Sequence, residues 1–237
     1  ETKALAGWTF FDLNRPRDAI RLYKSALYSA KETGDNPLAA CALGYWSYLL
    51  SSQGNVSGAA RMLQEASDYI RGSAAATQAW ISARRAEEQS ALGDANNALR
   101  SIDKSISVFD YADPANERPW TCFFTPSRLG SFTVSAYSRM KHRDTDSVAA
   151  TLLSSLAPTE TKVKALILAE LAMSAARHRD FDRVQSLVEQ SAPLALRTEA
   201  SLALDKLWDI VELLPANQGT AGQTRKKLTE RLLGTRT

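Results

Sequence analysis

Small and apolar residues recur along the chain with a fixed spacing that is typical of packed helices. In five segments, a small residue is followed after 12 positions by a second small or apolar residue and after 7 more by a third. These residues are Gly7, Ala19 and Ala26; Ser47, Ala59 and Ala66; Ala86, Ala98 and Ser105; Ala136, Val148 and Ser155; and Ala172, Val184 and Ser191. Small side chains let two helices cross closely and leave room for a third. The pattern therefore predicts five helical hairpins packed in series.

A turn signal separates the two helices of each predicted hairpin. The turn residues are Asn14-Arg15, Gly54-Asn55, Gly93-Asp94, Arg143-Asp144 and Arg179-Asp180. In the last four pairs, the Asn or Asp side chain can accept a backbone hydrogen bond and so cap the second helix. In the first pair we expect Asn14 to be the cap, with Pro16 in the first turn of the helix, where its missing N–H costs nothing.

The fourth segment begins 50 residues after the third, whereas the other steps are 40, 39 and 36 residues, so the chain carries an insertion there. Within residues 110–126, prolines break any helix, yet the segment is too aromatic for a solvated linker. It could act as a lid, fill the core or form a dimer contact, and the sequence leaves these alternatives open. Its aromatic residues are Tyr111, Trp120, Phe123 and Phe124.

The C-terminal part of the chain predicts a cap and a tail. Residues 201–214 carry apolar side chains on one face, as a helix that covers the end of a helical repeat requires. Residues 215–222 indicate a linker, and residues 224–233 could form a short basic helix. We therefore divide the chain into a helical domain, 1–214, and a linker with a basic, solvated tail, 215–237.

The offsets and the Gly-Asp turn resemble the tetratricopeptide repeat, whose period is about 34 residues. The resemblance covers residues 1–195, although the steps here are longer and the Trp and Pro that usually open and close that repeat are mostly missing. It implies an all-α fold: a right-handed superhelical solenoid of about five helix pairs, followed by the capping helix.

Three stretches resemble a narrower family, the actinomycete Cro/C1-type (XRE) helix-turn-helix transcriptional regulators that carry such repeats after a small DNA-binding domain. They are residues 42–48 (ALGYWSY), 108–131 (VFDYADPANERPWTCFFTPSRLGS) and 155–160 (SLAPTE). The resemblance implies a cytoplasmic regulator that is often a homodimer. The chain opens at Glu1 rather than at Met, so we expect a fragment, with DNA binding carried by a domain upstream of residue 1.

In stacked helical hairpins, the first helix of each pair lines the concave face. The repeat register places soft and aromatic side chains there, with a few charges among them, which suits a peptide or a small apolar ligand. The alternative is that the aromatic side chains fill space between helices. The expected groove residues are Trp8, Phe11, Asp12, Tyr45, Tyr48, Trp80, Arg84, Glu87, Arg128, Tyr137, Met140, Lys141 and Met173.

Composition and charge exclude several classes of protein. No stretch of 18 apolar residues exists, so no transmembrane helix is expected. A net charge of +3 is too small for a nucleic-acid surface on a chain of 237 residues. The cysteines, Cys41 and Cys122, fit a reducing compartment rather than a secreted disulfide scaffold.

The sequence gives little support for catalysis. His142 and His178 each precede Arg-Asp at the same repeat position, which favours a cation at a helix C-terminus over a catalytic base. Neither histidine has a second His or Cys at metal-ligand spacing. No phosphate-binding glycine loop and no nucleophile elbow occurs. We therefore expect no enzyme, metal or cofactor.

The expected function is sensing. The groove would bind a peptide, a small molecule or a partner protein, and binding would change the geometry of a dimer and so the spacing of two DNA-binding heads. The alternative is an adaptor scaffold that joins proteins without switching.

Overall fold

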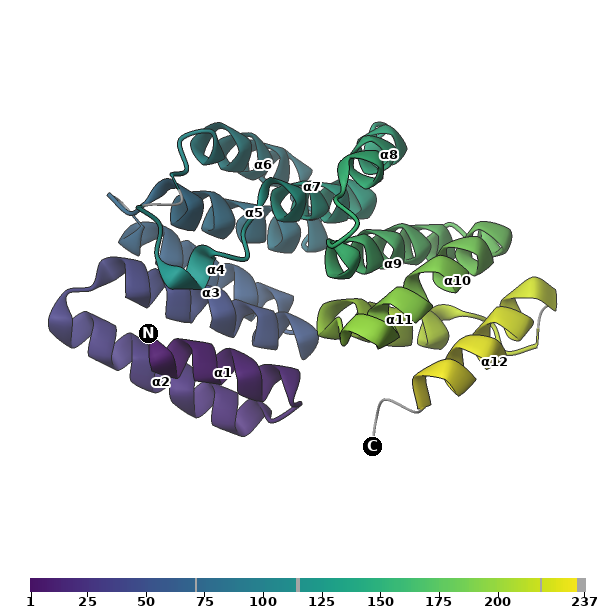
Figure 1. The fold of residues 1–237 in the computed structure, drawn as a ribbon, viewed down its shortest axis with the longest axis horizontal. Helices are drawn as coiled ribbons and strands as arrows, with labels where there is room; N and C mark the ends of the chain where they lie inside the picture. Colours follow the sequence, from purple (N-terminus) through teal and green to yellow (C-terminus); the bar gives the residue numbers. More distant parts are fainter. Residues whose placement is uncertain (71, 114–115, 218, 234–237) are drawn as a thin grey trace. The chain divides into compact units, whose positions relative to one another are not determined.

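The computed structural model describes residues 1–70, 72–113, 116–217 and 219–233. Over these ranges the chain forms twelve α-helices, one short 3₁₀ helix and no strand, so the predicted all-α class is confirmed (Figure 1). No helix within them is both long and apolar enough to cross a membrane. The elements are α1 (Thr2–Asp12), α2 (Pro16–Thr33), α3 (Asn36–Ser52), α4 (Val56–Tyr69), α5 (Ala75–Ala91), α6 (Ala95–Phe109), η1 (Pro119–Thr121), α7 (Pro126–Met140), α8 (Thr145–Ser155), α9 (Thr161–Arg177), α10 (Phe181–Thr198), α11 (Ser201–Leu213) and α12 (Gly219–Leu233).

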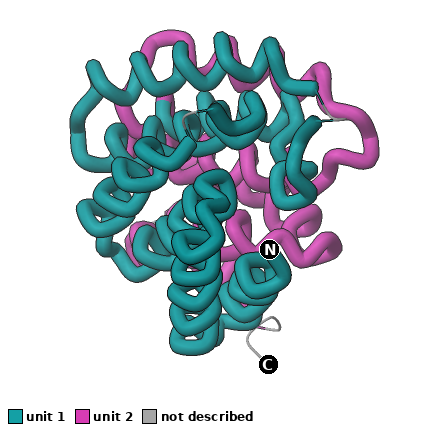
Figure 2. The backbone as a smooth tube through the Cα atoms, turned by 90° about the vertical axis from the view of Figure 1, so that its left-hand side faces the viewer, with its two compact units in different colours: residues 1–136 teal, residues 137–237 magenta. Residues whose placement is uncertain are grey.

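The chain divides into two compact units, with the boundary inside α7 (Figure 2). Unit 1 comprises Glu1–Ala136, and unit 2 comprises Tyr137–Thr237.

In unit 1, each helix from α1 to α6 packs against the next along the chain, and α3 also contacts α1 and α5. The first helices of successive hairpins therefore lie against one another. The small residues of the repeat occupy the closest approaches: a Cβ atom at Gly7 would lie 2.5 Å from Tyr23 Cε1, on the following helix. The second and third repeat positions of this unit are buried, namely Ala19, Ala26, Ala59, Ala66, Ala98 and Ser105.

Two of the predicted caps in unit 1 are confirmed. Asn55 accepts a hydrogen bond from the Gly58 N–H at 2.9 Å, and Asp94 accepts one from the Asn97 N–H at 3.2 Å. The expected cap at Asn14 is wrong, because that residue takes the left-handed conformation (φ 54°) that glycine takes in the other two turns. Asn tolerates this conformation better than most residues do, so it replaces glycine here rather than capping the helix.

In unit 2, α9 packs against α10, α11 packs against both, and α12 contacts α10 and α11. The predicted helix at 201–214 is present as α11. The structure also has a helix from Gly219, where the sequence indicates a linker up to residue 222 and a solvated tail. Leu228 and Leu232, one helical turn apart, are buried in the apolar core of unit 2, and their burial explains why this basic segment is packed.

The fourth hairpin departs from the repeat register. Its left-handed residue is Lys141 (φ 56°), and the following N–H, of His142, donates to Tyr137 O at 2.9 Å. Lys141 lies five positions after Ala136, whereas Arg179, the left-handed residue of the next turn, lies seven after Ala172. The turn therefore comes two residues early, and the loop before α8 is longer.

This shift overturns a second predicted cap. Asp144 precedes α8 but makes no side-chain capping bond, whereas Asp180 in the next turn caps α10 by accepting from the Arg183 N–H at 3.2 Å. Further along α8, Val148 is only half-buried and Ser155 is exposed, while their counterparts in α10 are buried.

Candidate functional site

An aromatic cluster joins the first helices of the three hairpins in unit 1. Trp8 of α1 contacts Tyr45 and Tyr48 of α3, with ring centroids 5.4 and 5.2 Å apart, and Tyr45 contacts Trp80 of α5 at 5.2 Å. The structure thus brings these groove candidates together. Trp80 is 0% exposed and both tyrosines are buried. At the edge of the cluster, Trp8 and Phe11 are half-buried and Asp12 is exposed.

A buried ion cluster lies beside these rings. The Arg84 side chain is 3% exposed; it pairs with Glu87, and its Nη2 donates to Glu88 Oε1 at 2.6 Å. Its guanidinium lies 3.9 Å from the centroid of the Tyr48 ring. Burial lowers the pKa of Arg84, but the charges of Glu88 and Glu87 outweigh it and raise the pKa overall. Ser51 completes the cluster by donating to Glu88 Oε1 at 2.5 Å.

The aromatic insertion packs on this cluster. The Tyr45 hydroxyl donates to Trp120 O at 3.1 Å, and Phe123 meets Trp80 edge-to-face with centroids 5.5 Å apart. Trp120 and Phe124 are buried, Phe123 is half-buried, and Tyr111 is 82% exposed. The insertion therefore covers the cluster through the Phe123 ring and the Trp120 carbonyl, whereas Phe124 packs against Phe109 and Phe132. Residues 114 and 115 of the insertion lie outside the described ranges.

Two charged residues attach the insertion to helix starts. Glu117 Oε1 accepts from the Ala76 N–H at 2.9 Å, which caps α5 in place of a residue of its own. Arg118 pairs with Asp35, the N-cap of α3, at 2.5 Å and lies over the Trp120 ring. The insertion thus supplies the cap that α5 lacks, whereas α3 is capped by its own Asp35, which accepts from the Leu38 N–H at 3.2 Å and is held by Arg118.

The remaining groove candidates have separate surroundings. Arg128 is buried in unit 1, where it lies 4.3 Å from the Phe132 ring centroid. In unit 2, Met173 belongs to the apolar core. Tyr137 stacks on His142 with centroids 4.2 Å apart. Met140 is half-buried and Lys141 is exposed.

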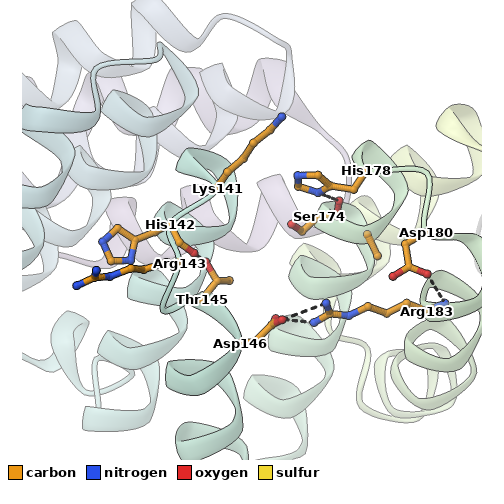
Figure 3. A pocket seen from close by; sticks show the side chains of 10 residues that line it. Lys141, His142, Arg143, Thr145, Asp146, Ser174, His178, Asp180 and Arg183 are labelled. Carbon is orange, nitrogen blue, oxygen red and sulfur yellow. Dashed lines mark hydrogen bonds and ion pairs between the residues drawn. The ribbon is translucent and has the colours of Figure 1, made fainter.

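Unit 2 holds a cavity of about 200 Å³ between the α7–α8 and α9–α10 turns, which we call the turn pocket (Figure 3). It is polar and open, in contrast to the aromatic cluster. Its lining residues are Lys141, His142, Arg143, Thr145, Asp146, Ser174, Ala175, His178, Asp180 and Arg183.

The carboxylates of the turn pocket already have partners. Arg183 donates two hydrogen bonds to Asp146, at 3.1 and 2.5 Å, and this pairing lowers the pKa of Asp146. Asp180 accepts from the Arg183 N–H. His178 Nδ1 lies 2.8 Å from Ser174 O. In Figure 3, Lys141 extends away from Asp146 and Arg183 on the side of the cavity where His178 lies, whereas His142 and Arg143 point the other way.

Sequence reasoning missed this pocket, although it singled out both histidines. Treating the two His-Arg-Asp triplets as equivalent hid the two-residue shift that separates them. No local signal marks the shift, because a cation, Lys141 or Arg177, precedes each triplet and neither turn has a glycine.

Both cysteines lie near the aromatic cluster, and both interact electrostatically with Tyr45. Cys41 is buried in α3, where burial raises its pKa, and Cys122 is exposed in the insertion. Both thiols are free, and the part of the chain that is described contains no group of three His, Cys, Asp or Glu residues that could hold a metal ion.

Comparison of the sequence with protein-family models finds no match, and comparison with curated proteins finds no relative.

Proposed function

We propose that this chain is a tetratricopeptide-like module, a right-handed solenoid of about five hairpins, that senses a peptide, small-molecule or protein ligand as the regulatory half of a helix-turn-helix regulator. One observation carries the repeat part of the proposal. The hairpins α1–α2, α3–α4, α5–α6 and α9–α10 bury small or short side chains at the same three offsets, and their turns have the left-handed residue at the same place.

A hydrogen bond made by the serine at the third repeat position also supports a true repeat. Ser105 Oγ donates to Ala79 O at 2.7 Å, and Ser191 Oγ donates to Ala165 O at 2.8 Å. Each bond joins the second helix of a hairpin to the first over the same 26 residues. A helix-rich composition alone would not place the same buried hydrogen bond at the same position of two hairpins. We therefore infer that these hairpins are copies of one repeat unit.

Binding, rather than catalysis, is the activity that fits the aromatic cluster. Trp8, Phe11 and Asp12 form its accessible edge, and aromatic side chains at such an edge are effective anchors for a ligand. Deeper binding against Trp80 would require the insertion to leave, and in that case residues 110–126 would act as a lid.

The regulatory role rests on the resemblance over residues 42–48, 108–131 and 155–160. A homodimer would let ligand binding change the distance between two DNA-binding heads, provided the ligand prefers one dimer geometry. DNA contact would then belong to a domain upstream of residue 1.

An adaptor scaffold is the second candidate, and one observation favours it: the central aromatic side chains are already packed against the insertion. A scaffold would use the outer surface and would not move the insertion.

The test is a binding screen of the chain against a random peptide library, followed by two alanine variants. Trp8→Ala should weaken the binding of the captured peptides by about 1–3 kcal/mol, because an aromatic anchor is lost. Tyr28→Ala is the control, since Tyr28 is an exposed aromatic residue of α2 with no ring contact to the cluster. Equal binding by both variants would refute the aromatic edge as the site.

The dimer and the DNA-binding head are tested separately. Sedimentation of the chain gives its oligomeric state, and translation of the coding sequence upstream of Glu1 shows whether a helix-turn-helix precedes it. A full-length protein without such a motif would remove the transcriptional role and leave the scaffold.

A further inference from the structure

The turn pocket exists because one turn departs from the repeat. In the α9–α10 turn the left-handed residue is Arg179 and the next residue, Asp180, caps the helix. In the α7–α8 turn the left-handed residue comes two positions early, so Lys141 is followed by a longer loop and Asp144 does not cap α8. Packing of the hairpin does not require this loop, since the other hairpins are built without it.

The charges around the pocket favour an anion. Its lining includes three permanent cations and two carboxylates, together with both histidines of the chain. Asp180 caps α10, and Asp146 pairs with the Arg183 guanidinium, so these two charges compensate each other while the remaining N–H groups of Arg183 can still donate. Arg143 points away from the cavity in Figure 3, which leaves Lys141 as its uncompensated cation. Lys141 is exposed and extends on the side of the cavity where His178 lies (Figure 3).

The amino end of α8 adds to this arrangement. Thr145 and Asp146, its first two residues, line the pocket, and the preceding Asp144 supplies no side-chain oxygen to their end of the helix. The Thr145 N–H already donates to His142 O at 3.1 Å, but no side chain caps the rest of this first turn, and a helix start attracts negative charge. Two cationic side chains, Lys141 and Arg183, line the same cavity.

We propose that the turn pocket binds a phosphate group, free or on a small molecule, between Lys141, His178 and Arg183. The ammonium and guanidinium groups supply charge-assisted hydrogen bonds, and the imidazole supplies a further donor when it is protonated. The site lies within unit 2 and shares no residue with the aromatic cluster. Its test is therefore independent of the test of the sensing role proposed above.

The histidines provide a direct readout. His142 and His178 are the only histidines in the chain and both line the pocket, so their imidazole NMR signals report on this site alone. Titration with inorganic phosphate at constant pH and ionic strength should shift the His178 signals with saturation. Sodium chloride at matched ionic strength should not. Signals that respond equally to both salts would overturn the proposal.

Two substitutions at left-handed turn positions test the contribution of Lys141. Lys141→Asn removes the charge while keeping a residue that tolerates φ 56°, and Arg179→Asn makes the same change at φ 61° outside the pocket lining. We expect Lys141→Asn to weaken phosphate binding about fivefold or more and Arg179→Asn by less than about twofold. Lys141→Gly should behave like Lys141→Asn, and circular dichroism checks that each variant is folded. An equal loss in the Lys141 and Arg179 variants would mean that overall charge, not the pocket, holds the anion.

Two ligands distinguish the sources of the phosphate. Glycerol 3-phosphate should shift the same His178 signals at a lower concentration than inorganic phosphate if the pocket takes a phosphate ester. The reverse order would indicate free phosphate, and both results support the site. Absence of saturable shifts with either ligand would refute it.

Discussion

The aromatic cluster of unit 1 and the turn pocket of unit 2 are built by hairpins of the same spacing, yet one is filled and the other is open. In the cluster, hairpins in register bring Tyr45 and Trp80 together, and the insertion covers both. At the turn pocket, a turn that comes two residues early leaves a polar cavity. The comparison teaches that hairpins in register bring aromatic rings together and a non-repeating insertion closes the surface they form, whereas a turn out of register leaves a cavity open.

The same contrast separates the ion pairs. The Arg84 side chain is 3% exposed between Glu87 and Glu88, whereas the Arg183 side chain, paired with Asp146, is 42% exposed. Solvent screens the second pair and hardly reaches the first. Loss of the buried pair is therefore expected to affect folding strongly, and loss of the exposed pair only weakly.

The largest effect is expected from Trp80→Ala. Its ring is fully buried against Tyr45 and Phe123, and truncation leaves a large cavity, so we expect a loss of about 3–5 kcal/mol in the free energy of unfolding. Urea denaturation measures it. Tyr111→Ala is the control within the insertion; because Tyr111 is exposed, its effect should stay within about 0.5 kcal/mol. Similar values for the two variants would mean that the cluster is not closed.

Arg84→Met should follow, with a loss of about 3 kcal/mol, because Glu87 and Glu88 would remain buried without their cation. The double variant Arg84→Met/Glu88→Met should recover part of that loss, since the burial of an unpaired carboxylate is relieved. Chemical denaturation of the single and double variants forms the measurement. A double variant less stable than Arg84→Met would show that the hydrogen bond from Ser51 to Glu88 is worth more than the relief of the unpaired charge.

Serine occupies the third repeat position in three hairpins, two of which keep the repeat register while the third, α7–α8, is shifted. Ser105→Ala and Ser191→Ala each remove a buried hydrogen bond to a helix carbonyl, and each should cost about 1 kcal/mol. Ser155→Ala removes only an exposed bond to Leu152 O in its own helix and should stay within about 0.5 kcal/mol. Thermal melting of the three variants gives the values. A loss of stability for Ser155→Ala equal to that of the other two variants would mean that the fourth hairpin keeps the repeat register after all.

Local signals made most of the fold predictable from the sequence. The small residues fixed the packing offsets, and Asn55, Asp94 and Asp180 cap helices where the turn signals placed them. These features depend on residues within a few positions of one another. The errors at Asn14 and Asp144 arose where a turn has no glycine, because several residues can then take the left-handed position.

The candidate site was less predictable because it depends on distant contacts. The register placed Trp8, Tyr45 and Trp80 on first helices that pack together, but Tyr45 and Trp80 also contact Trp120 and Phe123 of the insertion, and Tyr45 and Trp120 are 75 residues apart. No periodic pattern carries that information. The turn pocket depends likewise on where a turn falls, which the spacing of small residues does not determine.

Asp146→Asn should have the smallest effect on the free energy of unfolding, and that effect should depend on pH. The hydrogen bonds from Arg183 lower the pKa of Asp146 below its ordinary value of 3.8, so the charged form is favoured in the folded state. The stabilisation is therefore complete above the unfolded pKa of about 4 and is lost as the pH falls through the lower folded pKa. Because the pair is exposed, we expect at most about 0.5 kcal/mol at neutral pH.

Thermal melting of wild type and Asp146→Asn between about pH 2 and pH 7 tests this sign. The difference in melting temperature should be greatest above the unfolded pKa and vanish at the acid end. Asp144→Asn is the matched control, because the nearest cation to its carboxylate, Arg143, lies 3.7 Å away and makes no such hydrogen bond. A difference for Asp146→Asn that persists in acid would come from packing rather than charge. The Arg183 guanidinium would then be less firmly held beside the turn pocket than the geometry indicates.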